Sequence, residues 1–145
     1  MWRKNLGRNN FLVLGRAGMD LYADPPGAEV ESATQFFAAL GGSAGNIAAG
    51  IARLGGRAAL LSAVSDDAVG RFVRNALQGY GVDTTHVTTT GGERRTSLAV
   101  VETRAVQPQS VIYRNAAADF ALSPGQLDAV DWLALGALQG NRISV

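Results

Sequence analysis

The chain has 145 residues, of which 47% are hydrophobic, 7% aromatic and 17% charged, values typical of one packed domain. It contains no cysteine and one histidine, which excludes a disulfide scaffold, a thiolate zinc site and a histidine-rich metal cluster. Thirteen basic and twelve acidic residues leave a formal charge of +1, so charge does not indicate nucleic acid or a membrane surface as a partner. Because no stretch approaches the ~18 consecutive apolar residues of a membrane span, the sequence predicts a soluble, cytoplasmic protein.

The first predicted elements are a strand, a polar excursion and a helix. Phe11 to Leu14 is an all-apolar run closed by Gly15, which is typical of a strand buried in a parallel sheet. Segment 21–31 is polar and contains a Pro-Pro-Gly turn, so it is expected to leave the sheet as a short exposed hairpin. From Ser43 to Leu54 apolar residues recur along one helical face, with Ser43 as the expected N-cap and Gly55-Gly56 as the stop.

A second strand and a second helix follow directly. Segment 58–64 is apolar and predicts a strand. The clearest helical stripe of the chain then runs to about Tyr80, and either Asp66 or Asp67 is expected to cap it. A short strand is expected over 82–87. Strand, helix and strand in this order favour right-handed parallel crossovers.

The last part of the chain predicts a hairpin, a helix and a strand. Segments 95–104 and 109–115 are rich in Val, Thr, Ile and Tyr and flank a proline turn, which indicates an antiparallel hairpin. Ser123-Pro124 is expected to open a third helix, and 132–138 to form a strand. Because no helix follows to cover that strand, residues 1–145 are expected to be a single partial α/β domain, incomplete at the C-terminus.

Glycines and polar residues gather at two points that an α/β sheet brings to one edge. Gly41 and Gly42 precede the first helix, where free N–H groups attract oxygen-rich ligands, and Asn46 lies in its first turn. Asp20 comes shortly after the first strand, at the edge where open α/β sheets bind ligands, and its carboxylate suits two vicinal hydroxyls. The same residues also suit structural roles, namely close packing for the glycines and capping for Asp20.

Few other residues suggest chemistry. Arg114 follows Tyr113 near the end of the predicted hairpin, where its forked donors suit a carboxylate ligand, although a solvated arginine is the alternative. The Asp66-Asp67 pair precedes a helix and is expected to cap it, and His86 has no acidic neighbour at useful spacing. The sequence therefore predicts no catalytic residue and no metal ligand in this chain.

Taken together, these motifs resemble those of the ribokinase-like (phosphofructokinase-B type) carbohydrate kinases. The resemblance covers about residues 11–138 and depends on the order and spacing of 15–20, the Pro-Gly excursion, Gly41-Gly42-Ser43-Ala44-Gly45-Asn46, Leu54-Gly55-Gly56 and 64–70. Within the family, segments 15–22, 95–101 and 111–115 resemble the branch that acts on 5-dehydro-2-deoxygluconate in inositol catabolism.

The resemblance implies a doubly wound α/β domain with a small β lid, formed by about 21–31 and 95–115, over the sugar. It implies transfer of the γ-phosphoryl group of ATP, with Mg²⁺, to a sugar hydroxyl. Asp20, Gly41, Gly42 and Asn46 match family residues that hold sugar hydroxyls, and Tyr113-Arg114 matches a pair that contacts the acid end of keto-sugar acids. Such lids pair between subunits, so the resemblance also implies a homodimer.

One part of the family pattern is missing. Family members carry a later Gly-Ala-Gly-Asp motif with the catalytic base and the anion hole, followed by the adenine site, and this sequence does not contain the motif. The chain is therefore expected to be the sugar-binding half of a kinase, without the main ATP site and inactive alone. The alternatives are a non-catalytic sugar-binding or dimerising module left from a truncated kinase, and a fragment without a stable fold.

Overall fold

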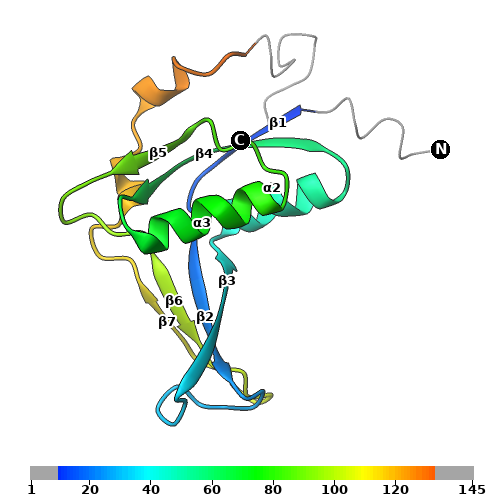
Figure 1. Cartoon of the computed structure of the whole chain (residues 1–145), viewed down its shortest axis with the longest axis vertical. Helices are drawn as coiled ribbons and strands as arrows, with labels where there is room; N and C mark the ends of the chain where they lie inside the picture. The colour runs from blue at the N-terminus through cyan, green and yellow to red at the C-terminus, as the bar shows by residue number, and fades with distance from the viewer. Residues whose placement is uncertain (1–9, 133–145) are drawn as a thin grey trace.

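The computed structural model describes residues 10–132, and one of its two sheets is parallel. Strands β1 (Asn10–Leu14), β4 (Arg57–Ser65) and β5 (Val87–Thr90) form this sheet in the order β1-β4-β5 (Figure 1). Helices α2 (Ser43–Arg53) and α3 (Ala68–Gly79) precede β4 and β5, and both pack on β4. Because both connections advance in the same direction across the sheet, right-handed crossovers place the two helices on one face.

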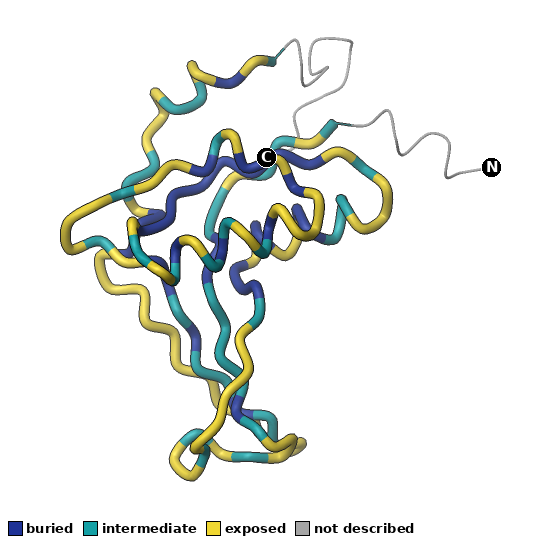
Figure 2. Tube along the Cα trace, viewed as in Figure 1, coloured by how far each residue is buried: buried dark blue, intermediate teal, exposed yellow. Residues whose placement is uncertain are grey.

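The hydrophobic core lies between β4 and the two helices. Ala58, Leu60 and Val64 alternate along β4 and belong to one cluster with Val73 and Leu77 of α3. The two α3 residues are four positions apart and both fully buried, as the predicted helical stripe requires. Burying a leucine of this kind stabilises the fold by about 1.5–3 kcal/mol. Figure 2 shows burial concentrated on β4 and on the sides of the helices that face it.

The other sheet has four strands and extends away from the helices (Figure 1). It consists of β2 (Gly18–Asp24), β3 (Gln35–Gly41), β6 (Leu98–Val101) and β7 (Ser110–Tyr113), in the order β3-β2-β6-β7. β2 pairs with β3 in antiparallel and with β6 in parallel orientation, and β6 and β7 form the predicted antiparallel hairpin. We call these four strands the small sheet.

Two strands of the small sheet differ from the sequence prediction. Where the sequence predicted a loop and a polar excursion after β1, the structure has a regular strand, β2, which ends at Asp24. The strand β3 was not predicted at all. Residues 36–40 of β3 read Phe-Phe-Ala-Ala-Leu, without the alternation of a half-buried strand, although Gly41-Gly42 directly after them are a turn signal. β3 is a strand because seven of its residues pair with β2. Pairing with a partner elsewhere in the chain cannot be recognised from the local sequence.

Three further elements differ in position or length. The strand expected over 82–87 is β5 and begins at Val87, because Asp83 Oδ1 accepts bonds from Thr85 and forms a turn before it. The third helix is a single 3-10 turn, η2 (Pro124–Leu127), after the similar η1 (Ala118–Ala121). Trp132 Nε1 and the Val130 N–H each donate to the Leu127 carbonyl at 3.2 Å, so that carbonyl is already bonded where an α-helix would use it for residue 131. The strand predicted over 132–138 begins at the last described residue, and the rest of it lies outside the described residues.

Between residues 10 and 132 no helix has both the length and the apolar character needed to cross a membrane.

Candidate functional site

The parallel sheet and the small sheet meet where Gly18, Gly41 and Gly42 lie together. β1 ends at Leu14, and the chain enters the small sheet at Gly18, which pairs with Gly41 at the end of β3. α2 begins two residues after Gly41. The carboxyl end of β1, the first residue of β2 and the start of α2 therefore lie at one junction, the edge where α/β sheets bind ligands.

Gly41 and Gly42, like Gly18, have no room for a side chain at this junction. A Cβ at Gly41 would lie 1.9 Å from Asp20 Oδ1, and a Cβ at Gly42 would lie 2.5 Å from the Arg16 carbonyl oxygen. Gly42 also has φ +85°, a conformation that favours glycine. The atoms that exclude these side chains belong to Asp20 and to the loop before it, so both glycines are required by close packing.

The start of α2 is open to a ligand. Gly42, and not the predicted Ser43, is the N-cap residue, and neither a capping side chain nor an acidic residue occupies the first turn. The first N–H groups of a helix have no partner inside it; here the Gly45 N–H donates to the Arg16 carbonyl at 3.2 Å, and the N–H groups before it remain for ligand oxygens. Asn46 is exposed in this turn, and its backbone N–H donates to the Gly42 carbonyl at 2.9 Å.

Asp20 lies on β2 between two small residues. Its neighbours across the strands are Ala39 of β3 and Ala99 of β6, and the residue is half-buried. Tyr22, two residues along the same strand face, donates from Oη to Asp20 Oδ2 at 3.5 Å. Burial, the Asp20 charge and this hydrogen bond raise the pKa of Tyr22, so its hydroxyl remains a donor. Sequence analysis missed Tyr22, although the Asp-Leu-Tyr spacing indicates it once 18–24 is known to be a strand.

Tyr113 does not join this group. It lies opposite Leu98, which lies opposite Met19, whereas Asp20 belongs to the next row of the sheet. Because adjacent rows present side chains to opposite faces, Tyr113 and Asp20 are on different faces of the small sheet.

Arg114 is already paired. Its guanidinium forms an ion pair with the buried Asp119 carboxylate of η1 and lies over the Phe120 ring, 4.6 Å from the centroid. Asp119 was not singled out from the sequence, because a residue five positions away in an irregular segment gives no local signal. An acidic ligand at Arg114 would have to share this cation with Asp119.

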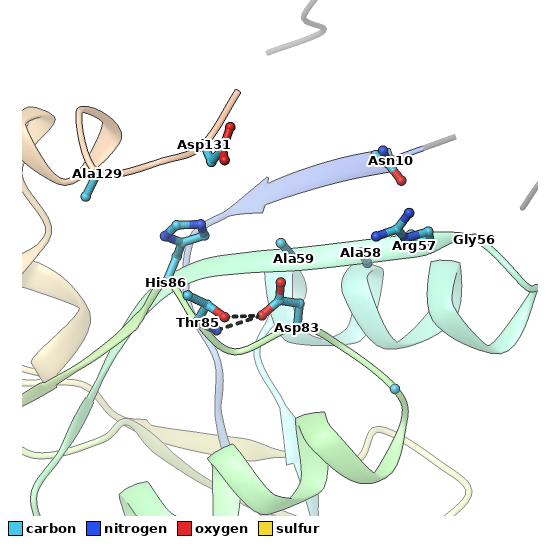
Figure 3. Close-up of a pocket in the computed structure, with 11 residues that line it drawn as sticks. Asn10, Gly56, Arg57, Ala58, Ala59, Asp83, Thr85, His86, Ala129 and Asp131 are labelled. Atoms are coloured by element: carbon cyan, nitrogen blue, oxygen red, sulfur yellow. Dashed lines mark hydrogen bonds between the residues drawn. The ribbon is translucent and has the colours of Figure 1, made fainter. Parts of the chain in front are cut away.

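A separate cavity of about 410 Å³ lies at the opposite edge of the parallel sheet. Figure 3 shows Asn10 and Arg57, the first residues of β1 and β4, on its lining together with Asp83, Thr85 and His86. This cavity is at the amino ends of the strands and shares no residue with the glycine junction. The lining of this cavity carries charges of both signs. The hydrogen bonds from Thr85 are the main cause that lowers the pKa of Asp83, and His86 and Arg57 lower it further.

Comparison with known proteins agrees with this architecture. Residues 8–140 match the model of the pfkB family of carbohydrate kinases. The chain is 39% identical over 117 residues to 5-dehydro-2-deoxygluconokinase of Photobacterium profundum, an overlap that covers 81% of this chain and 35% of that protein. It thus spans about a third of the length of the curated relatives that it matches.

Solved structures give the same result. Fructokinase with bound ATP from Xylella fastidiosa is 28% identical, with a TM-score of 0.69 over 80% of this chain and 36% of that one. 2-Dehydro-3-deoxygluconokinase of Thermotoga maritima is 21% identical, with a TM-score of 0.74 over 86% and 37%, a likeness of fold alone. The predicted fold class is confirmed. Because the family model matches nearly the whole sequence and the structure has the family's fold, the chain belongs to the pfkB family of carbohydrate kinases.

Proposed function

We propose that this chain forms the sugar-binding part of an ATP-dependent carbohydrate kinase whose substrate is 5-dehydro-2-deoxygluconate, an intermediate of inositol catabolism. The observation that carries the proposal is the Asp20 carboxylate lying against Gly41, directly before the open end of α2. The 39% identity to a relative named 5-dehydro-2-deoxygluconokinase supports the choice of substrate.

The chemistry of the junction suits a polyhydroxylated ligand. The Asp20 carboxylate accepts hydrogen bonds from two neighbouring hydroxyls, and the Asn46 amide both donates and accepts. Gly41 and Gly42 let the ligand approach the backbone, and the N–H groups of α2 that precede Gly45 donate to its oxygens. The small sheet covers the sugar as a lid. Since phosphoryl transfer depends mainly on positioning, the part of this chain in the reaction is to fix the sugar hydroxyl.

ATP supplies the phosphoryl group and Mg²⁺ neutralises its developing charge in this proposal, but the described residues offer no site for the metal. Within 10–132 no three His, Asp or Glu side chains gather as a metal site would require. The sole lysine, Lys4, lies outside this range. We therefore assign no transfer step to these residues, and we infer that the chain is inactive alone and that both groups bind the part of the longer relatives that it does not span.

Self-association through the small sheet is a second candidate function. Phe37 and Ile112 are 53% and 51% exposed on the Asp20 face of this sheet, and Tyr113 is 60% exposed on the opposite face, so large apolar side chains lie free on both faces. We propose a homodimer that buries Phe37 and Ile112. Sedimentation of the chain and of Ile112→Asp tests it: the dimer should dissociate in the variant, and a monomeric wild type would contradict the proposal.

Calorimetric titration with 5-dehydro-2-deoxygluconate tests the sugar site. We expect the 145-residue chain to bind it, and Asp20→Ala to weaken binding by about tenfold or more, equivalent to about 1.4 kcal/mol. Asp24→Ala is the matched control, because Asp24 lies on the same face of β2 about 13 Å further along and should leave the affinity unchanged. Equal affinities for all three proteins, or no binding by the wild type, would refute the proposal.

A further inference from the structure

Arg16 lies at the point where the chain leaves the parallel sheet and enters the small sheet. Its carbonyl oxygen accepts a hydrogen bond from the Gly45 N–H at 3.2 Å, and the same oxygen excludes a side chain from Gly42. The Arg16 backbone is thus packed against the turn of α2 that carries Asn46. This position places a half-buried guanidinium beside the junction that the proposed function assigns to the sugar.

The Arg16 guanidinium is on the same face of the small sheet as Asp20. Its Nη1 donates to Ser97 Oγ at 3.1 Å. Ser97 Oγ lies 2.7 Å from the position that a Cβ of Gly18 would occupy. It therefore lies on the face of the sheet to which a side chain at position 18 would point. Gly18 and Asp20 are two residues apart in β2, and residues at this spacing point to the same face.

Arg16 differs from the other half-buried arginines in what its guanidinium binds. Arg74 donates to two backbone carbonyls and to a threonine hydroxyl, Arg94 donates to a backbone carbonyl, and Arg104 pairs with two glutamates. In the described part of the chain, the partner of the Arg16 guanidinium is one neutral hydroxyl, and no carboxylate lies within ion-pair distance of it. A guanidinium fork that is partly withdrawn from water and holds one hydroxyl retains donors suited to an anion.

The arginine expected from the family resemblance is less suited to that role. The Arg114 charge is neutralised by Asp119, and Tyr113 beside it is on the face opposite Asp20. We therefore propose that Arg16 binds the carboxylate of the sugar acid and makes the site select an acid over a neutral sugar. This inference rests on the proposed function. With Asp20 repelling the carboxylate and Arg16 attracting it, the ligand is held in one orientation, its hydroxyls toward Asp20.

The test compares 5-dehydro-2-deoxygluconate with its uncharged primary amide, by calorimetric titration of the 145-residue chain. We expect the wild type to bind the acid about tenfold or more tightly than the amide, because a bidentate charge-assisted contact is lost with the amide. Arg16→Gln should bind the acid as weakly as the amide, with the amide affinity unchanged. Arg114→Gln is the matched control and should keep the preference for the acid.

Other outcomes separate this inference from the proposed function. If Arg16→Gln keeps the preference and Arg114→Gln loses it, Arg16 is not the carboxylate ligand, although the sugar site stands. If the wild type binds the acid and the amide equally, the inference about Arg16 fails, and the sugar site again stands. If the wild type binds neither ligand, the proposed function fails with it. Arg16→Lys, which keeps the charge without the fork, covers the case in which Arg16→Gln does not fold, and it should retain part of the preference.

Discussion

The Asp20 carboxylate occupies the space that a side chain at position 41 would need. A Cβ there would lie 1.9 Å from Oδ1, so Gly41→Ala must either displace the carboxylate or separate β2 from β3. We expect a loss of about 1–3 kcal/mol in the free energy of unfolding, typical of an overpacked site. We also expect sugar affinity to fall by about tenfold or more. Urea unfolding and calorimetric titration measure the two effects.

Gly50→Ala is the control for that substitution. Gly50 lies in α2 with nothing within 4 Å of its potential Cβ, and alanine is favoured over glycine in a helix by up to about 1 kcal/mol. This variant should be as stable as the wild type or more so, with unchanged sugar affinity. If the two glycine variants behaved alike, the close contact at Gly41 would have no functional meaning.

Single residues of the site were predictable only where a local pattern marked them. Gly41 and Gly42 precede a helix that the apolar stripe predicts, so their position was accessible from the sequence. That Tyr113 lies on the face opposite Asp20 depends on the register of three strands, which a one-residue shift would reverse. The Arg114–Asp119 pair likewise forms through tertiary packing, and no spacing in the sequence indicates it.

Among the elements, α3 has the best defined start. Asp67 Oδ1 accepts the backbone N–H groups of Val69 and Gly70, both at 3.0 Å, as the sequence predicted for one residue of the Asp66-Asp67 pair. Asp67→Ala should lower the free energy of unfolding by about 1 kcal/mol, the usual cost of losing an N-cap. Asp66→Ala, at the exposed neighbour, should cost much less. Equal losses in thermal or urea unfolding would contradict this assignment.

The same cap gives α3 a pH dependence. Burial alone raises the pKa of Asp67, but the bonds from Gly70, Ser65 and Val69 and the Arg95 charge outweigh it and hold the pKa below its ordinary value. A depressed pKa in the folded state means that the stabilisation is present above about pH 4 and is lost as the pH falls through the folded value. Asp67→Asn should therefore show a shallower fall in stability below about pH 4.

Urea unfolding between neutral and acid pH measures that slope. Part of this slope should remain in the variant, because Glu102, directly after β6, also has a lowered pKa, chiefly through the backbone bond from Gln109. An acid slope identical to that of the wild type would show that the cap does not titrate with folding.

Helices were easier to predict than strands for a physical reason. The α3 stripe is set by a periodicity of 3.6 residues within one segment, and the structure buries it as expected. β3 is apolar without alternation, and its partner β2 lacks the length of apolar sequence that marks a buried strand. Both are stabilised by pairing with each other, which depends on residues that lie outside each segment.

At the scale of the whole molecule, two buried hydroxyls join the sheets. Ser65 at the end of β4 donates from its N–H to Thr96 Oγ1 at 2.8 Å, and the Thr96 N–H donates to Ser65 Oγ at 3.0 Å. Thr96→Val keeps the shape but leaves the Ser65 N–H unsatisfied, which should cost about 1–3 kcal/mol. Hydrogen exchange should accelerate in β6 more than in β4, because the small sheet loses its connection to the core.

Thr88→Val is a suitable control, since Thr88 is exposed and its hydroxyl bonds to the Ser62 carbonyl at 3.3 Å within the parallel sheet. It should leave exchange in β6 unchanged. Uniform acceleration of both sheets in the Thr96 variant would mean that they open as one unit and that the pair is not a joint between them.

The fold class followed from the order of elements, because strand, helix and strand in succession allow few arrangements. The order of elements did not show which strands would form the small sheet. Its central contact, the parallel pairing of β2 with β6, joins segments on either side of the α2-β4-α3 unit. Only the assembled molecule brings Arg16, Ser97 and Asp20 to one surface.

That parallel pairing also determines the order in which a nascent chain can complete the site. The ribosome releases β2 and β3 together, and they can form their hairpin at once. β6 emerges much later, since Arg16 and its partner Ser97 are separated by 81 positions. Until then β2, the strand that carries Asp20, has an unpaired edge, which in a growing polypeptide favours aggregation. β2 is therefore the part of this protein for which a chaperone would matter most during translation.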